Sequence, residues 1–215
     1  MHNLKGFIFD MDGVVVDNHS FHFKAWMEFA DKYKFELNDK IYRDNFNGKT
    51  NADLFKMIFG NIPQDQMDAY ALEKESNYQK LYLKEMKALK GLIDYLEYLK
   101  VHRFKVALGT SAPTSNVDFI LDKLFLRKYF DVIVDGPQVI RGKPDPEVYL
   151  RCATLLELDP KNCVVFEDSL AGLESGASAG CHIVGVATSH QAFELKPLTE
   201  NIIYDFTEAR SLLGY

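Results

Sequence analysis

The sequence has few cysteines, no long apolar run and no block of basic residues. Its three cysteines, Cys152, Cys163 and Cys181, are odd in number and form no CxxC pair, which is not typical of a disulfide framework or a zinc site. They favour a reducing compartment, and we expect a cytoplasmic protein. No segment approaches the roughly 18 consecutive apolar residues of a membrane span. Because "FIFDMDG" already occupies residues 7–13, we expect neither a signal peptide nor a membrane partner.

The balance of charge argues against a nucleic-acid partner. Lys and Arg number 25 against 31 Asp and Glu, for a net charge of −6, and neither sign forms a long run. We therefore expect no nucleic-acid binding, whereas a small charged ligand is compatible with this balance. With 215 residues, of which 47% are hydrophobic and 26% charged, the chain has the composition of one globular domain with a sizeable insertion. We expect a monomer rather than an oligomer.

Short apolar runs rich in β-branched and aromatic residues predict buried strands. These runs lie at Gly6–Phe9, Phe104–Leu108, Phe130–Val134, Val164–Phe166, Ile183–Val186 and Ile202–Tyr204. Helical periodicity separates most of them, for example at Leu89, Leu92, Ile93, Leu96 and Leu99. The alternation of strands and helices predicts an α/β protein with a doubly wound parallel sheet, a Rossmann-like core with helices on both faces.

Residues 18–86 interrupt this alternation. They contain helical periodicity, as at Phe21, Ala25, Phe29 and Tyr33, and no convincing strand, so we predict an inserted α-helical cap. The predicted core is then formed by residues 1–17 and 87–215. Turns are predicted within the insertion at "FNGKTN" (Phe46–Asn51) and "GNIP" (Gly60–Pro63).

Two carboxylates follow the first predicted strand directly. Asp10 and Asp12 stand in "DMDG", and side chains at the carboxyl ends of parallel strands point into the crevice where ligands bind. An Asx turn after a strand would explain an isolated pair of this kind equally well. Further polar elements follow later strands, however, and favour a functional site: they are Thr110-Ser111, Lys143 and Glu167-Asp168.

Each of these elements also has an ordinary structural explanation, because a Thr-Ser pair often caps a helix and a loop Lys is usually solvated. In combination they indicate a bound cation and a bound anion. Paired carboxylates at two strand ends suit Mg²⁺, while Thr110, the amides after it and Lys143 offer donors to a phosphate. With Asp12 taken as protonated, the other carboxylates and a phosphate dianion sum to about −5, which Lys143 alone cannot offset. We therefore expect a metal.

In this order the elements resemble the motifs of the haloacid dehalogenase superfamily of phosphotransferases, in the subgroup with a helical cap after the first strand. The matching segments are "DMDGVVVD", "GTS", "GKPDPEVY" and "VVFEDSLAGLESGASAG", and the resemblance covers the whole chain. It implies a Mg²⁺-dependent phosphatase in which Asp10 is the nucleophile that forms an aspartyl phosphate and Asp12 is the general acid and base. It also implies phosphate binding by Thr110, Ser111 and Lys143, metal binding by Asp10, Asp168 and the Asp12 backbone carbonyl, and a place for Glu167 in the outer environment of the metal.

The chain resembles the β-phosphoglucomutase group and its sugar-phosphatase relatives more closely still. "DNHSFHFKAW", "NGKTNADLF" and "EKESNY" carry this resemblance, which implies cap residues His22, Lys49, Asn51 and Lys74 beside the substrate. His22 can also be explained as a packing residue. Two departures argue against a mutase, because Asn51 replaces the arginine that would hold a second phosphate and Pro113 replaces a basic residue. We expect hydrolysis of a small phosphorylated metabolite such as a sugar phosphate, with a phosphosugar mutase and a non-catalytic phosphate-sensing module as the alternatives.

Overall fold

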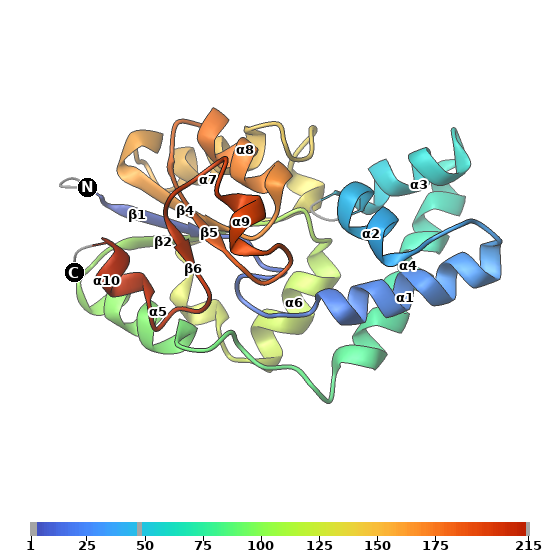
Figure 1. Cartoon of the computed structure of the whole chain (residues 1–215), viewed down its shortest axis with the longest axis horizontal. Coiled ribbons are helices and arrows are strands. Elements are labelled where there is room, and N and C mark those ends of the chain that lie inside the picture. Colours follow the sequence, from blue (N-terminus) through green and yellow to red (C-terminus); the bar gives the residue numbers. More distant parts are fainter. Residues whose placement is uncertain (1–3, 47–48, 214–215) are drawn as a thin grey trace.

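A six-stranded parallel sheet forms the centre of the structure (Figure 1). The computed structural model describes residues 4–46 and 49–213. The strands are β1 (Gly6–Phe9), β2 (Lys105–Gly109), β3 (Val132–Val134), β4 (Cys163–Glu167), β5 (His182–Val186) and β6 (Ile202–Ile203). Their order in the sheet is β3-β2-β1-β4-β5-β6, and every neighbouring pair is parallel. The predicted doubly wound α/β fold is confirmed.

The strand order places a switch point between β1 and β4. β2 and β3 extend the sheet on one side of β1, whereas β4, β5 and β6 extend it on the other. Phe9, the last residue of β1, pairs with Leu108 of β2 and with Phe166 of β4. The segments that follow these three strands therefore leave the sheet side by side, at the edge where open α/β sheets bind their ligands.

The largest departure from the predicted strands is β3, which the apolar run predicts at Phe130–Val134 and which begins at Val132. A 3₁₀ helix, Arg127–Tyr129, ends just before this run. The Asp131 amide donates to the Val106 carbonyl of β2, but the Val106 amide donates to the Asp131 side chain, at Oδ2 (2.8 Å). The other strands lie within one residue of the prediction at each end.

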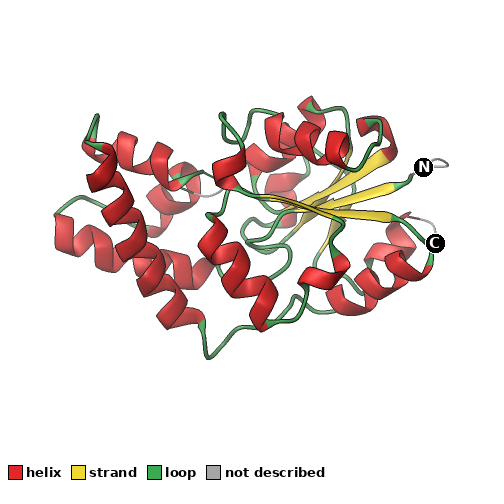
Figure 2. Cartoon of the chain, turned by 180° about the vertical axis from the view of Figure 1, so that it is seen from behind, coloured by secondary structure: helices red, strands yellow, loops and turns green. Residues whose placement is uncertain are grey.

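Helices cover both faces of the sheet, as Figure 2 shows. One face carries α5 (Leu92–Val101), α6 (Thr114–Lys123) and α10 (Ala209–Leu213), the other carries α7 (Glu147–Leu155) and α8 (Leu170–Ser178), and the short α9 (Ala192–Leu195) contacts β5. The side chains of β1 alternate between the two, since Phe7 and Phe9 join the cluster under α5 and α6 whereas Ile8 joins the cluster under α7. Within the described residues, no helix is long and apolar enough to cross a membrane.

Four further helices, which we call the cap, lie beyond the carboxyl ends of the strands: α1 (His19–Tyr33), α2 (Asp39–Asn45), α3 (Asn51–Phe59) and α4 (Gln64–Tyr82). Their apolar side chains form a cluster of their own, built from Trp26, Phe29, Ala30, Leu37, Tyr42, Phe46, Leu54 and Phe55. Tyr78 and Tyr82, at the end of α4, instead join the cluster of the sheet. The end of α4 is therefore part of the core packing. The cap boundaries at residues 18 and 86 stay a prediction.

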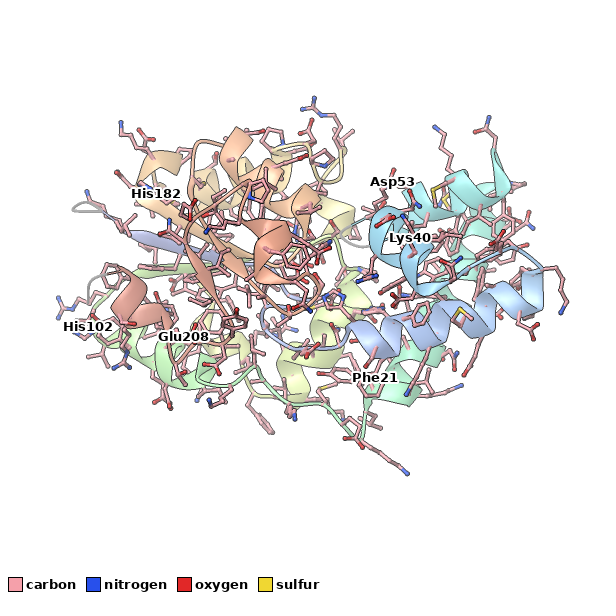
Figure 3. The ribbon with its side chains drawn as sticks, in the orientation of Figure 1. Phe21, Lys40, Asp53, His102, His182 and Glu208 are labelled. Atoms are coloured by element: carbon pink, nitrogen blue, oxygen red, sulfur yellow. The ribbon has the colours of Figure 1, made fainter. Side chains whose placement is uncertain are left out.

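The start of α3 is set by a local cap. Residues 47 and 48 of the predicted "FNGKTN" turn lie outside the described residues. After them, Thr50 Oγ1 accepts a hydrogen bond from the Asp53 amide (3.2 Å) and donates one to the Asp53 carboxylate (2.8 Å; Asp53 is labelled in Figure 3). The capped turn fixes the place of Asn51, the first residue of α3.

Candidate active site

The segments after β1, β2 and β4 meet at the switch point of the sheet. Asp10 follows β1, Thr110 follows β2, and Glu167 and Asp168 stand at the end of β4. Lys143 reaches the same place from the loop before α7. A cavity at this place is lined by all but one of the predicted core residues: Asp10, Asp12, Thr110, Ser111, Lys143 and Asp168. The exception, Glu167, is fully buried beside them.

Lys143 lies between two carboxylates at the floor of this cavity. Its Nζ donates to Asp10 Oδ1 (2.8 Å) and to Glu167 Oε1 (2.5 Å). Burial opposes the charge of Lys143, but the two carboxylates raise its pKa above the usual value. Lys143 is thus a buried cation held next to Asp10.

Both carboxylate oxygens of Glu167 are engaged inside the fold. Oε1 accepts from Lys143 and from the Tyr149 hydroxyl (2.8 Å), and Oε2 accepts from the backbone amides of Asp168 (2.9 Å) and Ser169 (3.0 Å). Gly172 of α8 makes room for this carboxylate, because a Cβ at its position would collide with Glu167. Glu167 therefore orients Lys143 and the loop that carries Asp168.

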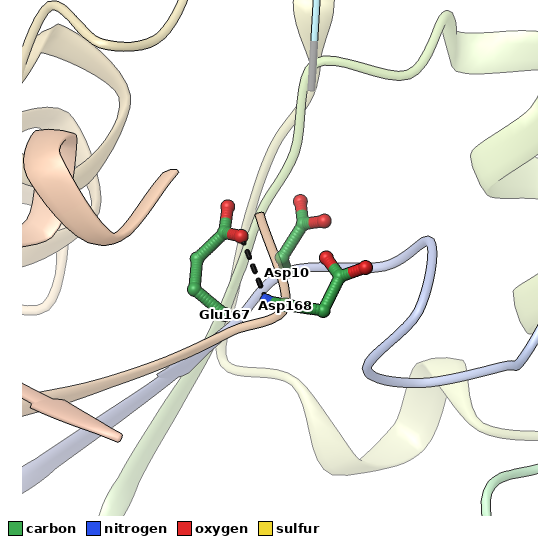
Figure 4. A group of neighbouring side chains, drawn as sticks. All are labelled: Asp10, Glu167 and Asp168. Carbon is green, nitrogen blue, oxygen red and sulfur yellow. Dashed lines mark hydrogen bonds between the residues drawn. The ribbon is translucent and has the colours of Figure 1, made fainter. Parts of the chain in front are cut away.

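Three carboxylates gather at the ends of β1 and β4 (Figure 4), and one oxygen from each of Asp10, Glu167 and Asp168 lies within 4.8 Å of the others. Burial raises the pKa of Asp10 to about 8; Lys143 opposes this rise, and the charges of Glu167 and Asp168 add to it. The protein alone therefore leaves negative charge under-compensated here. Oxygen ligands with excess negative charge fit a hard divalent cation such as Mg²⁺, and Asp10 and Asp168 border the cavity where it would bind.

His19, the first residue of α1, contacts the predicted metal ligand Asp168. Its Nε2 lies 2.6 Å from Asp168 Oδ2, and although burial opposes protonation, the carboxylate raises the pKa of His19 to about 9. Gly13 permits this approach, since its φ is +80° and a Cβ there would collide with both Asp168 and His19. Nothing in the sequence pattern singles out His19 except its place in the same segment as His22.

Asp12 is held in its ionised form in this structure. Asn18 Nδ2 donates to Asp12 Oδ1 (2.7 Å), and His22 Nε2 lies 3.6 Å from Oδ2. Burial opposes ionisation, but His22 and Asn18 outweigh it and lower the pKa of Asp12 to about 2. The charge count takes Asp12 as protonated beside a bound phosphate, whereas this carboxyl is ionised in the free site.

The turn after β2 lines another part of the cavity. The Thr110 amide donates to the Val134 carbonyl of β3 (2.9 Å), and Thr110 Oγ1 accepts from the Ala112 amide (3.1 Å). Residues 111–113 continue along the cavity into α6, which begins at Thr114. An anion here would lie beside the amino end of a helix and the Lys143 ammonium, both of which favour negative charge.

The cap closes the cavity with buried polar side chains. Lys74 Nζ lies 2.9 Å from His22 Nδ1, and the ring of Tyr78 stacks on His22 with centroids 3.7 Å apart. Burial and the charge of Lys74 lower the pKa of His22. A neutral imidazole accepts a hydrogen bond from the Lys74 ammonium at Nδ1, and its Nε2 hydrogen then faces Asp12. His22 and Lys74 both line the cavity, where the resemblance places them.

The remaining predicted cap residues, Lys49 and Asn51, also line the cavity. Lys49 is exposed. Asn51 Nδ2 donates to Glu75 Oε1 (2.7 Å), and Glu75 Oε2 accepts from Nδ2 of Asn116 on α6 (2.7 Å). The sequence pattern does not reveal Glu75 or Asn116, although Glu75 follows Lys74 directly in "EKESNY".

A doubly wound sheet with buried carboxylates at its switch point and helices over their crevice defines a class of α/β enzymes. Residues 7–186 match the family model for haloacid dehalogenase-like hydrolases, and the chain belongs to this family. It is 34% identical over 187 residues to the phosphorylated carbohydrates phosphatase of Thermotoga maritima, which covers 86% of this chain and 87% of that protein. It is 32% identical over 191 residues to beta-phosphoglucomutase of Bacillus subtilis, with 85% and 83% covered.

A solved structure agrees with these relatives. The crystal structure of beta-phosphoglucomutase from Clostridium difficile superposes with a TM-score of 0.83 at 27% identity, over 95% of this chain and 92% of that one. The resemblance to the β-phosphoglucomutase-like group of the superfamily is confirmed.

Proposed function

We propose that this protein hydrolyses phosphate monoesters of small carbohydrates, with Asp10 as the nucleophile and Mg²⁺ as the cofactor. The observation that carries the proposal is the buried carboxylate of Asp10 at the end of β1, with Lys143 Nζ 2.8 Å away and Asp168 at the end of the neighbouring strand. A carboxylate nucleophile divides hydrolysis into two easier displacements. Similarity to a phosphorylated carbohydrates phosphatase supports the substrate class.

The two displacements use Asp10 and Asp12 in turn. First, a carboxylate oxygen of Asp10 attacks phosphorus, the ester P–O bond breaks, and Asp12 gives its proton to the leaving oxygen. Water then attacks the aspartyl phosphate, Asp12 takes a proton from that water, and Asp10 is released together with inorganic phosphate. Asp12 must be protonated for the first step, and a phosphate dianion bound beside it raises its pKa from the low value of the free site.

The other core residues bind and orient the phosphoryl group. Lys143 and the turn at Thr110 and Ser111 donate to its oxygens, while Glu167 keeps Lys143 in place. Mg²⁺ held by Asp10, Asp168 and the Asp12 backbone carbonyl would neutralise charge so that Asp10 stays ionised.

A phosphosugar mutase is the second candidate, because relatives named beta-phosphoglucomutase resemble this chain. A mutase has to hold a second phosphate, and the described cap residues near Asn51 offer little for this. The Asn51 amide already donates to Glu75, Pro113 carries no charge, and Lys49 is an exposed point charge without the two-pronged geometry of Arg. Hydrolysis is therefore favoured over transfer to a sugar hydroxyl.

Release of inorganic phosphate from carbohydrate monophosphates, measured with Mg²⁺ and with EDTA, tests the proposal. We expect release with Mg²⁺ and none in chelator. The proposal is wrong if calorimetry shows that the protein binds phosphate but no phosphate is released from p-nitrophenyl phosphate or from any of the carbohydrate monophosphates. The protein is then a phosphate-sensing module.

A further inference from the structure

Glu75 is a buried carboxylate in the cap wall of the cavity, and the reaction does not use it. It lies on α4 with 5% of its surface exposed. Asn51, Lys74 and Asn116 line the same part of the cavity. A buried carboxylate is costly unless it is paired and hydrogen-bonded.

Three donors from three elements hold the Glu75 carboxylate. Oε1 accepts from Asn51 Nδ2 of α3 (2.7 Å) and from Lys74 Nζ of α4 (2.9 Å), and Oε2 accepts from Asn116 Nδ2 of α6 (2.7 Å). Burial opposes ionisation, but the charge of Lys74 and the hydrogen bonds from Asn51 and Lys74 keep the pKa of Glu75 below its usual value. Glu75 is therefore a fixed negative charge.

This charge cancels the cation that a second phosphate would need. Lys74 is the buried lysine among the described cap residues of the cavity, and its ammonium is already paired with Glu75. The Asn51 amide is engaged by the same carboxylate. A second phosphate would have to displace Glu75 from these donors and then remain beside a like charge in a poorly solvated space, where repulsion is strong.

Glu75 can instead bind an uncharged, hydroxylated group of the substrate. A carboxylate has about four acceptor positions, and Glu75 uses three of them, two on Oε1 and one on Oε2. Oε2 can therefore accept one more hydrogen bond, which a substrate hydroxyl can donate and a phosphate dianion cannot.

We infer that Glu75 is a specificity-determining residue that restricts the cavity to esters with one phosphate and an uncharged, hydroxylated far end. The inference rests on the proposed phosphatase function and names its substrate class. Glu75 acts on the far end of the substrate, so it should affect the choice between substrates more than the chemistry at Asp10.

A symmetric pair of substrates tests this selectivity. The two ends of mannitol are equivalent, so mannitol 1-phosphate and mannitol 1,6-bisphosphate present the same scissile group and differ in the charge of the far end. Initial rates of phosphate release give kcat/KM for both, corrected for the two equivalent phosphates of the bisphosphate. We expect the wild-type protein to prefer the monophosphate by about tenfold or more, and Glu75→Gln to lower this preference by about tenfold. Glu75→Asp should retain the preference because it keeps the charge.

Glu73→Gln is the matched control, since it removes a carboxylate from the same helix at a position paired with Lys32 outside the cavity (2.7 Å). It should leave the preference unchanged. The inference is overturned if the wild-type protein takes both substrates equally or does not hydrolyse mannitol 1-phosphate, if Glu75→Asp loses the preference, or if Glu73→Gln changes it as Glu75→Gln does. Hydrolysis of p-nitrophenyl phosphate, which has no charged far end, keeps these outcomes distinct from failure of the phosphatase function. If Glu75→Gln does not fold by circular dichroism, the wild-type and Glu75→Asp ratios decide.

Discussion

His19 and Asp168 form an ion pair that joins the first turn of the cap to the end of β4, with 2.6 Å between Nε2 and Oδ2. The pair is largely buried, with 15% and 2% of the two side chains exposed. Because Asp168 is also the proposed metal ligand, His19 and the metal draw on the same carboxylate. A bound cation must therefore replace or share the interaction that His19 makes.

This competition predicts opposite effects of two substitutions on Mg²⁺ binding. His19→Ala should bind Mg²⁺ about fivefold more tightly, since one hydrogen bond to a charged group no longer has to be given up. Asp168→Asn should weaken binding by more than about tenfold because a ligand charge is lost. Titration calorimetry measures both, with His182→Ala, an exposed histidine at the start of β5, as the control. Weaker binding by His19→Ala would mean that His19 supports the metal site.

Asp10→Asn should remove turnover while the fold persists. The amide is nearly isosteric with the carboxylate but is not a nucleophile, so we expect activity on p-nitrophenyl phosphate to fall by more than about a thousandfold. Circular dichroism should show an intact fold. Asp31→Asn changes an exposed carboxylate in the cap and should retain full activity. Activity of Asp10→Asn within tenfold of wild type would rule out the aspartyl phosphate.

Loss of the Glu75 charge should cost stability in a manner that depends on pH. The pKa of Glu75 is lowered in the folded protein from its usual 4.5, so the ionised side chain stabilises the fold above that pH, and this contribution is lost as pH falls through the lowered value. Glu75→Gln should reduce the free energy of unfolding by about 2 kcal/mol at pH 7. Urea titrations should show this difference shrinking below pH 4.5. A difference that stays constant with pH would show that the charge is not responsible; Glu73→Gln should show little difference at either pH.

The products formed from a phosphosugar should distinguish the hydrolase from the mutase. With β-glucose 1-phosphate and a trace of glucose 1,6-bisphosphate, free phosphate should appear faster than glucose 6-phosphate. The buried cation among the described cap residues of the cavity, Lys74, is paired with Glu75, so it does not hold a second phosphate and orient a sugar hydroxyl ahead of water. Asn51→Arg should raise the share of glucose 6-phosphate, and more so together with Glu75→Gln, which leaves the guanidinium unpaired. Asn51→Gln adds length without charge and should leave the products unchanged. Glucose 6-phosphate forming many-fold faster than phosphate in the wild-type protein would support the mutase.

The positions of the core candidate residues could be predicted from the sequence, because each lies beside a strand that short sequence patterns reveal. A β-rich run that ends in "DMDG" places Asp10 at a strand end, and the parallel arrangement of strands brings it near Asp168 without any knowledge of side-chain geometry. The Gly-rich segment after β4 matches the motif as letters, but the sequence does not tell apart the tasks of its glycines. Gly176 packs closely on Val165 and Ile183, whereas Gly172 makes room for the Glu167 carboxylate.

The contacts made by the cap could not be predicted in the same way. His19 and Asp168 are 149 residues apart, and they meet only because α1 starts against the loop after β4. The contacts of Glu75 likewise depend on how α3, α4 and α6 are placed in space. Helical periodicity shows which face of a helix is apolar, but not which polar residue of another helix it will face.

Trp26 is the single tryptophan of the chain, and it lies in the cap with 2% of its surface exposed. It borders the cavity, and the Lys74 ammonium lies 5.1 Å from the centre of its ring. Fluorescence excited at wavelengths that tyrosine does not absorb therefore comes from Trp26 alone. We expect a bound substrate to change this fluorescence, because it would disturb the neighbouring Lys74 ammonium. Neither phosphate nor a carbohydrate absorbs at those wavelengths. The native protein thus contains an optical reporter of ligand binding and of cap loosening, whereas backbone circular dichroism follows the helices of the cap and of the core together.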